Sequence, residues 1–318
     1  MTWSGFHPFT VDAHGTQLFG VIGGSGPPLL LLHGYPQTHA CWARVAPALA
    51  ERFRVIALDL PGYGRSDAPQ EGPERYTKRR MATDVRAAMI RLGYPRFLLA
   101  GHDRGARVAY RLALDTPEAV AALAILDIVP TAAVWDTMSV AQGLALYHWF
   151  FLAQPAPLPE SLIGRDPVDF LDRTLASWTM AKDLSAFSPE ALASYRESMG
   201  RPQNVAASCM DYRAGATLDW AHDRESADAG HTIAAPVEVL WSTHFKLVGD
   251  RGVLDVWRDW ADDVDGARIE SGHFVCEENP EAVLARLIPF FSGHAHETGE
   301  RVPPPPPPDP HSHCGHDH

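Results

Sequence analysis

The stretch Leu99–Tyr110 reads LAGHDRGARVAY and decides the fold. Its centre, GHDRG, fits the pattern Gly-x-nucleophile-x-Gly, in which a reactive residue occupies a sharp turn between a buried strand and a helix. Gly101 and Gly105 allow the strained backbone and the close helix–strand packing of such a turn. The stretch therefore predicts a strand–helix unit of an α/β protein.

Strand and helix patterns alternate on both sides of this turn. The segment FTVDAHGTQLFGVIGG predicts an opening β-hairpin. Continuous apolar runs follow, as expected of strands buried on both faces: PPLLLLHG, RVIALD, RFLLAGHD, VAALAILDIVP, PVEVLWSTH and ARIESGH. Helical patterns lie between them, for example at residues 77–92 and around LDVWRDWADD. The alternation predicts a mostly parallel, doubly wound sheet.

The chain divides into four segments. Residues 131–224 lack buried-strand runs and are rich in aromatic residues and proline, which predicts an inserted helical cap. Residues 1–130 and 225–293 form the two parts of the α/β core around it. Residues 294–318 are rich in Pro and His, and we expect them to be disordered.

Composition limits the partners and the compartment. The 318 residues are 46% hydrophobic and carry a net charge of -12, which argues against nucleic acid and anionic membranes as partners. No secretory signal or membrane-spanning run is visible, so we expect a cytoplasmic protein. Cys41, Cys209, Cys276 and Cys314 form no CxxC motif and no disulfide scaffold.

The C-terminal tail has two interpretations. Its proline run predicts an extended spacer, followed by side chains that can bind divalent metal ions: His311, His313, Cys314, His316 and His318. The alternative, which we favour, is a solvated tail without a metal. We expect no metal in the active site and no cofactor.

Asp103 occupies the nucleophile position of the turn. A carboxylate that attacks a saturated carbon forms an ester, which water can cleave, whereas a serine would form a stable ether. Asp103 therefore indicates displacement of a halide or of an epoxide oxygen. The helix N-terminus should keep this carboxylate ionised. The alternative is an aspartate that only caps the helix.

A base and an orienting acid complete the candidate set. His273 follows the last predicted strand, in the chain order nucleophile, acid, base. Asp127 is a lone carboxylate in an apolar run at the end of a strand, and we favour it over Asp250 as the acid. The backbone N–H groups of Tyr35 and Arg104 are expected to form an oxyanion hole.

Two arginines accompany the nucleophile. Arg104 and Arg107 lie one turn apart on one helix face, and a substrate carboxylate would satisfy their excess charge. The alternative is a pair of surface ion pairs, which suits Arg107 better than Arg104. The arginine pair favours a small anionic substrate over neutral halides and epoxides.

The chain resembles the fluoroacetate dehalogenases, in the haloacetate dehalogenase branch of the α/β hydrolases. The resemblance covers roughly residues 5–292 and rests on HGYPQTH, DLPGYGRSD, YTKRRMA, AGHDRGARVAYRLALD, LDIVPT, YHWFFLAQPAPLPE, ASWT, DYRAGA and ESGHF. It implies hydrolysis of a haloacetate to glycolate and halide through an aspartyl ester, without a cofactor, by a homodimer.

The resemblance also implies roles for cap residues. His148, Trp149 and Tyr212 would donate hydrogen bonds to the departing halide, and Trp178 would line the pocket. The alternative is that these aromatic residues are cap core. Two departures from the family pattern are Tyr35, where phenylalanine is frequent, and the bulky segment STHFKLVGDRG at residues 242–252.

Three other functions remain as alternatives. An epoxide hydrolase would use Asp103 with two cap tyrosines, for which Tyr212 and Tyr147 are available. A haloalkane dehalogenase is disfavoured because Arg104 stands where those enzymes commonly carry a tryptophan. A binding protein that uses its His-rich tail would not need Asp103, Asp127 and His273.

Overall fold

An eight-stranded sheet forms the centre of the computed structural model, which describes residues 3–245, 251–299 and 301–303. The strands are β1 (Phe6–Ala13), β2 (Thr16–Gly23), β3 (Pro28–Leu32), β4 (Arg54–Leu58), β5 (Phe97–His102), β6 (Val120–Leu126), β7 (Val237–Ser242) and β8 (Val264–Ile269). Their order is β1-β2-β4-β3-β5-β6-β7-β8. Strand β2 is antiparallel to β1 and β4, and the other pairs are parallel. The predicted hairpin and mostly parallel sheet are confirmed.

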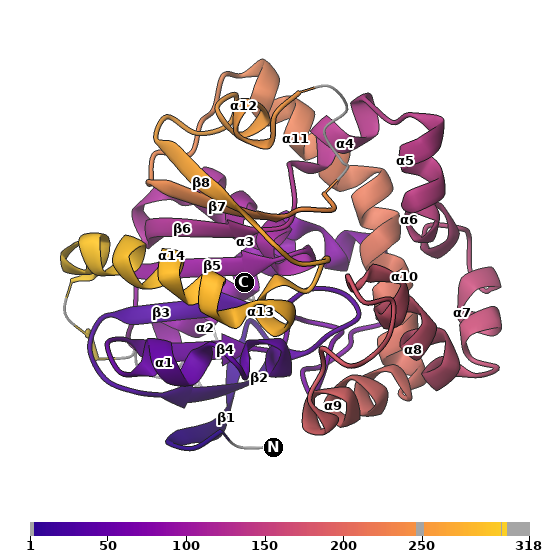
Figure 1. The fold of residues 1–318 in the computed structure, drawn as a ribbon, viewed down its shortest axis with the longest axis horizontal. Helices are drawn as coiled ribbons and strands as arrows, with labels where there is room; N and C mark the ends of the chain where they lie inside the picture. Colours follow the sequence, from indigo (N-terminus) through magenta and orange to yellow (C-terminus); the bar gives the residue numbers. More distant parts are fainter. Residues whose placement is uncertain (1–2, 246–250, 300, 304–318) are drawn as a thin grey trace, which may run out of the picture.

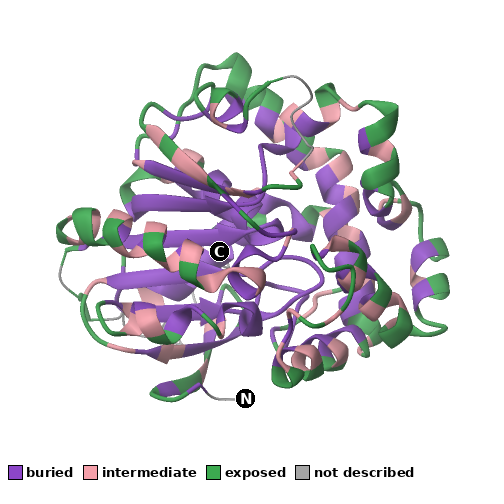
Figure 2. Ribbon diagram, viewed as in Figure 1, coloured by how far each residue is buried: buried purple, intermediate pink, exposed green. Residues whose placement is uncertain are grey.

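Helices cover both faces of the sheet (Figure 1). Helices α1 (Ala46–Ala50) and α14 (Pro280–His294) pack on one face, and α2 (Lys78–Arg91) and α3 (Arg104–Asp115) pack on the other. Strands β3, β5 and β6 are buried along their whole length, as their continuous apolar runs require (Figure 2). The carboxyl ends of these strands point toward the helical insertion.

The insertion consists of α4 (Thr131–Asp136), α5 (Val140–Ala145), α6 (Tyr147–Leu152), α7 (Leu158–Ile163), α8 (Pro167–Trp178), α9 (Pro189–Met199), α10 (Pro202–Ala216) and α11 (Leu218–Asp228). It forms a cap beside the carboxyl ends of the strands (Figure 1). Helix α10 lies at its centre and contacts α6, α7, α9 and α11. The last cap helix ends at Asp228, slightly beyond the expected boundary at residue 224.

Shorter elements complete the core: the 3-10 helices η1 (His39–Trp42), η2 (Pro73–Tyr76), η3 (Pro117–Ala119) and η4 (Ala295–Thr298), and the helices α12 (Val253–Trp257) and α13 (Val275–Glu278). The start of the C-terminal segment departs from the expected disorder. Thr298 is buried, and the Val302 amide donates to the carbonyl of Gly93 at 2.9 Å. The metal-binding candidates at residues 311–318 lie outside the described residues.

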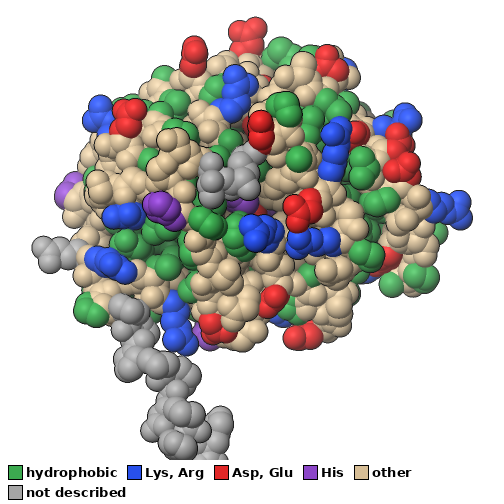
Figure 3. All heavy atoms as spheres, turned by 90° about the horizontal axis from the view of Figure 1, so that it is seen from below, with side chains coloured by type: hydrophobic (Ala, Val, Ile, Leu, Met, Phe, Trp, Pro, Cys, Tyr) green, Lys and Arg blue, Asp and Glu red, His purple; other side chains and the backbone are tan. Residues whose placement is uncertain are grey.

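The surface in Figure 3 carries interspersed basic and acidic side chains. The net charge of -12 is therefore not expressed as a uniform acidic field on this face. In the described part of the chain, no helix has both the length and the apolar character needed to cross a membrane. Cys41, Cys209 and Cys276 are buried and unpaired, and Cys314 is outside the described residues.

Candidate active site

Asp103 stands on a strained turn between β5 and α3. Its backbone has φ 46° and ψ -115°, which is rare for a residue with a side chain. Close packing maintains this turn. A Cβ on Gly34 would lie 2.5 Å from the Cβ of Asp103, and a Cβ on Gly105 would lie 2.3 Å from the carbonyl oxygen of His33. These distances leave no room for a side chain at Gly34 or at Gly105.

The loop after β3 holds one oxygen of Asp103. The Tyr35 amide donates to Oδ2 at 2.9 Å. His33 fixes this loop, because its Nε2 accepts from the Leu60 amide at 3.0 Å and its Nδ1 therefore donates to the Gly34 carbonyl at 2.9 Å. The Arg104 amide begins α3 and has no acceptor within that helix. Two backbone donors thus lie beside Asp103, at the positions predicted for an oxyanion hole.

His273 lies between the two aspartates. Its Nδ1 is 2.7 Å from Asp127 Oδ2, and its Nε2 is 4.0 Å from Asp103 Oδ1. The other oxygen of Asp127 accepts from the Ser242 amide at 2.7 Å. This bond pattern places the proton on Nδ1 and leaves Nε2 free to accept one. The alternative acid, Asp250, lies outside the described residues.

The loop that carries His273 is attached to the cap. The His273 amide donates to the carbonyl of Trp178 at 3.0 Å. A Cβ on Gly272 would come within 2.5 Å of Trp178 O and Met180 N, so only glycine fits there. His102 contacts the carbonyl of His273 through Nε2 at 2.8 Å.

Electrostatics favour an ionised Asp103. Burial alone would raise its pKa, but His273 and the two arginines Arg104 and Arg107 hold that pKa below the ordinary value of 3.8. Burial would likewise lower the pKa of His273, but the hydrogen bond and charge of Asp127, with Asp103, raise it above 6.5. The site therefore pairs an anion with a histidine of increased basicity.

Arg104 is neutralised by the cap. It donates to the Asp211 carboxylate from Nε at 3.0 Å and from Nη2 at 2.5 Å. Lys78 and Tyr63 bind the same carboxylate, Tyr63 at 2.7 Å. The Arg104 guanidinium also lies 4.3 Å from the centre of the Tyr212 ring. Sequence reasoning missed Asp211 and Lys78, although the two residues belong to the quoted motifs DYRAGA and YTKRRMA.

Arg107 has a different environment. Its side chain is 1% exposed, and no carboxylate of the described residues lies within ion-pair distance of it. Its Nη1 donates to the Val129 carbonyl at 3.2 Å and to Thr131 Oγ1 at 2.8 Å, whereas its buried Nε has no hydrogen-bond partner within residues 3–245, 251–299 and 301–303. The guanidinium lies 4.8 Å from the centre of the Trp149 ring. A buried cation with spare donors is suited to an anionic ligand.

An aromatic cluster next to Arg104 consists of Tyr35, His148, Trp178 and Tyr212. Tyr212 is 5.2 Å from Tyr35 and 5.7 Å from His148, measured between ring centres. Trp178 is 4.5 Å from His148 and 6.1 Å from Tyr35. Trp149 lies outside this cluster, against Trp135 at 5.4 Å and Arg107. Burial lowers the pKa of His148 to about 3, so this imidazole is neutral, and none of the described residues forms a hydrogen bond with its Nδ1.

A second, unpredicted carboxylate supports the oxyanion loop. Glu277 Oε1 accepts from the Tyr195 hydroxyl at 2.9 Å, and its Oε2 accepts from the Gln37 amide group. Burial raises the pKa of Glu277 to about 8. The cluster ties the loop after β3 to cap helix α9 and to α13.

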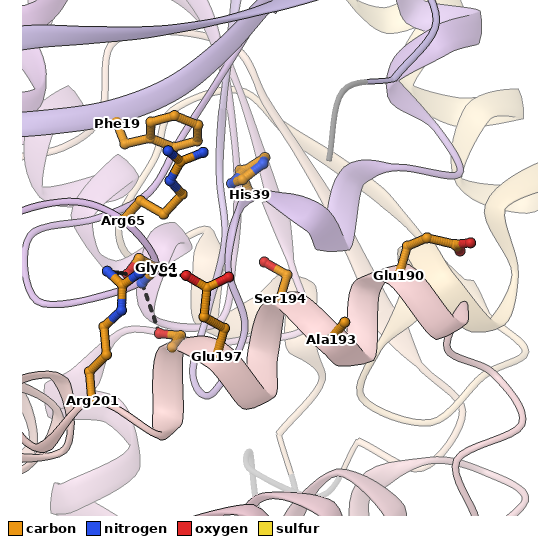
Figure 4. Close-up of a pocket in the computed structure, with 10 residues that line it drawn as sticks. Phe19, His39, Gly64, Arg65, Glu190, Ala193, Ser194, Glu197 and Arg201 are labelled. Atoms are coloured by element: carbon orange, nitrogen blue, oxygen red, sulfur yellow. Dashed lines mark hydrogen bonds and ion pairs between the residues drawn. The ribbon is translucent and has the colours of Figure 1, made fainter.

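A separate cleft of about 460 Å³ lies between the core and cap helix α9 (Figure 4). Glu190, Ser194 and Glu197 face Arg65 and His39 across it. None of the predicted site residues lines this cleft. The candidate active site is the group formed by Asp103, His273, Arg104 and Arg107, and not this cleft.

The fold and the residues around Asp103 define a class. Residues 27–280 match the alpha/beta hydrolase fold family. The chain belongs to this family, and the enzyme is a hydrolase.

Its relatives narrow the class further. The chain is 40% identical over 292 residues to a fluoroacetate dehalogenase of Burkholderia sp, which covers 91% of this chain and 95% of the relative. A soluble epoxide hydrolase of Corynebacterium sp. is 36% identical over 281 residues, 88% of this chain and 95% of that protein. The predicted relationship to the fluoroacetate dehalogenases is confirmed.

A solved structure shares the whole architecture. A Pseudomonas aeruginosa protein, provisionally described as an epoxide hydrolase and solved as a variant with bound MFA, is 43% identical with a TM-score of 0.89. The alignment covers 94% of this chain and 100% of that protein. Relatives named for two reaction types thus match this chain over most of its length.

Proposed function

We propose that the protein hydrolyses haloacetates, including fluoroacetate, to glycolate and halide. The observation that supports this substrate class best is Arg107, a buried guanidinium that has no carboxylate partner among the described residues and whose charge lowers the pKa of Asp103. A substrate carboxylate supplies the missing anion through charge-assisted hydrogen bonds. A neutral alkyl halide or epoxide would leave this cation unpaired.

The first step is displacement at the α-carbon. Arg107, with the remaining Nη1 group of Arg104, holds the substrate carboxylate. One oxygen of Asp103 attacks the α-carbon, a C–O bond forms, and the C–halogen bond breaks with its electron pair on the halide. In-line attack directs the halide toward the cap, where His148, Trp149 and Tyr212 supply N–H and O–H donors.

The second step cleaves the ester. His273 Nε2 accepts a proton from water, and the hydroxide attacks the carbonyl carbon of Asp103. The amides of Tyr35 and Arg104 stabilise the oxyanion, while Asp127 stabilises the imidazolium. Collapse of this intermediate breaks the bond between the Asp103 carbonyl carbon and the glycolate oxygen, which takes the proton back from His273, and Asp103 returns to a carboxylate by losing its proton to solvent.

Trapping the ester tests this proposal. His273→Asn should release one equivalent of halide and retain a carboxymethyl ester, which peptide mass spectrometry would locate on Asp103. Wild-type turnover in ¹⁸O-labelled water should place the label in the Asp103 carboxylate. An adduct on any other residue, or the absence of halide release from every haloacetate, would refute the proposal.

Epoxide hydrolysis is the second candidate, favoured by the similarity to the Corynebacterium enzyme. Its expected tyrosine pair is not supported, because Tyr147 is 50% exposed whereas Tyr212 is buried. A panel of carboxylated and neutral epoxides assayed beside the haloacetates separates the two activities. Diol formation without halide release would favour the second candidate.

A further inference from the structure

The Tyr35 side chain carries a polar group that the proposed mechanism does not use. The residue is 0% exposed, and its buried hydroxyl has no hydrogen-bond partner in the part of the chain that the structure describes. A buried hydroxyl without a hydrogen bond destabilises a folded protein. Because the amide of the same residue holds Asp103 at 2.9 Å, this unpaired hydroxyl calls for an explanation, and a partner that arrives with the ligand supplies one.

The ring contacts of Tyr35 place it in the cluster above Asp103. Its ring is 5.2 Å from Tyr212 at an interplanar angle of 81°, and 6.1 Å from Trp178. His148, the other member with a buried unpaired atom, contacts the same two rings. Within this cluster, Tyr35 therefore belongs to the core and His148 to the cap.

The Tyr35 hydroxyl carries a proton. Burial raises the pKa of Tyr35 well above 10, and Cys209, Tyr147 and Asp103 raise it further, in that order. Cys209 is one helical turn from Tyr212 on α10, and Tyr147 precedes His148 on α6. The hydroxyl is therefore protonated and can donate, and the ring that carries it contacts the cap residues Trp178 and Tyr212.

We propose that the Tyr35 hydroxyl is a further leaving-group contact, which donates a hydrogen bond to the departing halide and favours fluoride over the larger halides. The inference rests on the proposed haloacetate hydrolysis. The backbone and side chain of Tyr35 then serve different steps: the hydroxyl assists halide departure, and the amide stabilises the later oxyanion.

The preference for fluoride follows from its chemistry. Fluoride is the smallest and most strongly hydrogen-bonding halide, and its departure depends most on donors that strengthen as charge develops. Chloride and bromide leave more readily and gain less from an additional donor. The Tyr35 hydroxyl also reduces the space available to a larger atom.

Tyr35→Phe tests the inference, with Tyr94→Phe as the control outside the site. We expect Tyr35→Phe to lower kcat for fluoroacetate about tenfold or more, the usual effect of losing a charge-assisted hydrogen bond, and to change kcat for bromoacetate less than about threefold. KM should change little, because the bond strengthens only in the transition state. Tyr94→Phe should leave both substrates unaffected.

Two readouts separate this inference from the alternatives. Thermal unfolding should show an equal or higher Tm for Tyr35→Phe, because the variant removes an unsatisfied hydroxyl. Unchanged fluoroacetate turnover with faster bromoacetate turnover would overturn the hydrogen bond and indicate a purely steric role. Failure of the wild type on all haloacetates would instead refute the proposed function.

Discussion

Arg104 donates two hydrogen bonds to the carboxylate of Asp211, from Nε at 3.0 Å and from Nη2 at 2.5 Å. The pair joins the helix after the nucleophile to the central cap helix. It also uses most of the binding capacity of Arg104, so the two arginines predicted to act together have unequal environments. Among the described residues Arg107 has no carboxylate partner, whereas Arg104 is held by Asp211 and keeps only its Nη1 group, with two N–H donors, for a ligand.

This inequality predicts that Arg107 dominates substrate binding. Arg107→Lys should raise KM for haloacetates about tenfold or more, because lysine cannot reproduce the guanidinium fork. Arg111→Lys is the matched control on the same helix, since Arg111 is equally buried but pairs with Asp115 at 2.8 Å. Steady-state kinetics measure both. Equal KM values for the two variants would contradict the prediction.

The protonation of His273 predicts how the rate of the reaction falls at low pH. Ester hydrolysis requires neutral His273, so its rate should fall as the pH falls through the His273 pKa of the ester intermediate, in which the Asp103 charge is absent while the hydrogen bond to Asp127 remains. In the free enzyme Asp103 contributes to the raised pKa of His273, so Asp103→Asn should lower the His273 pKa in NMR titrations. An unchanged His273 pKa in Asp103→Asn would show that Asp127 alone sets it.

Glu277 predicts a pH dependence of stability. Its pKa of about 8 in the folded state exceeds the ordinary value of 4.5, so the folded protein binds this proton more tightly than the unfolded chain. The contribution is largest below the unfolded pKa and is lost as the pH rises toward 8. Tm should therefore fall over this range, and Glu277→Gln should reduce the slope. An identical slope in the variant would exclude Glu277 as the cause.

The contact between Gly34 and Asp103 predicts a large loss of activity. Gly34→Ala places a methyl group 2.5 Å from the Asp103 Cβ, and the displaced nucleophile should lower kcat about 10²-fold. Gly293→Ala in α14, where a Cβ meets nothing within 4 Å, is the control. Circular dichroism should confirm that both variants fold. Wild-type kcat in Gly34→Ala would show that the turn tolerates movement.

Exposed apolar side chains on the cap predict a homodimer. They lie on α5–α7 and include Val140 at 84%, Leu144 at 75% and Leu158 at 50% exposure. We expect this face to be the dimer contact. Val140→Glu with Leu144→Lys should convert the dimer to a monomer in light scattering, while Val302→Lys, also at an exposed site, should not. A monomeric wild type would contradict the prediction.

Local sequence patterns predicted most of the core. Continuous apolar runs identified β3, β5 and β6, and GHDRG identified the turn at Asp103, because these features depend on neighbouring residues. The choice of Asp127 agrees with its contact to His273, since a lone carboxylate in an apolar strand requires a partner.

Long-range pairing could not be predicted in this way. The Asp211 partner of Arg104 is distant in sequence, and nothing local distinguishes it from an ordinary polar residue of a cap helix. The support of Gln37 by Glu277 is equally non-local. The Tyr35 hydroxyl is unpaired because no neighbouring element of the described residues offers it a hydrogen-bond partner. Local sequence patterns do not reveal such a tertiary environment.

The bond from the His273 amide to the Trp178 carbonyl has a consequence for evolution and engineering. The cap is not an interchangeable module, because its backbone is part of the support of the base. A cap transplanted from an epoxide-hydrolase relative would place a different backbone segment opposite the His273 amide. Such a chimera should preserve residues 178–180 together with residues 271–274, or its base would be misaligned before substrate preference could be compared.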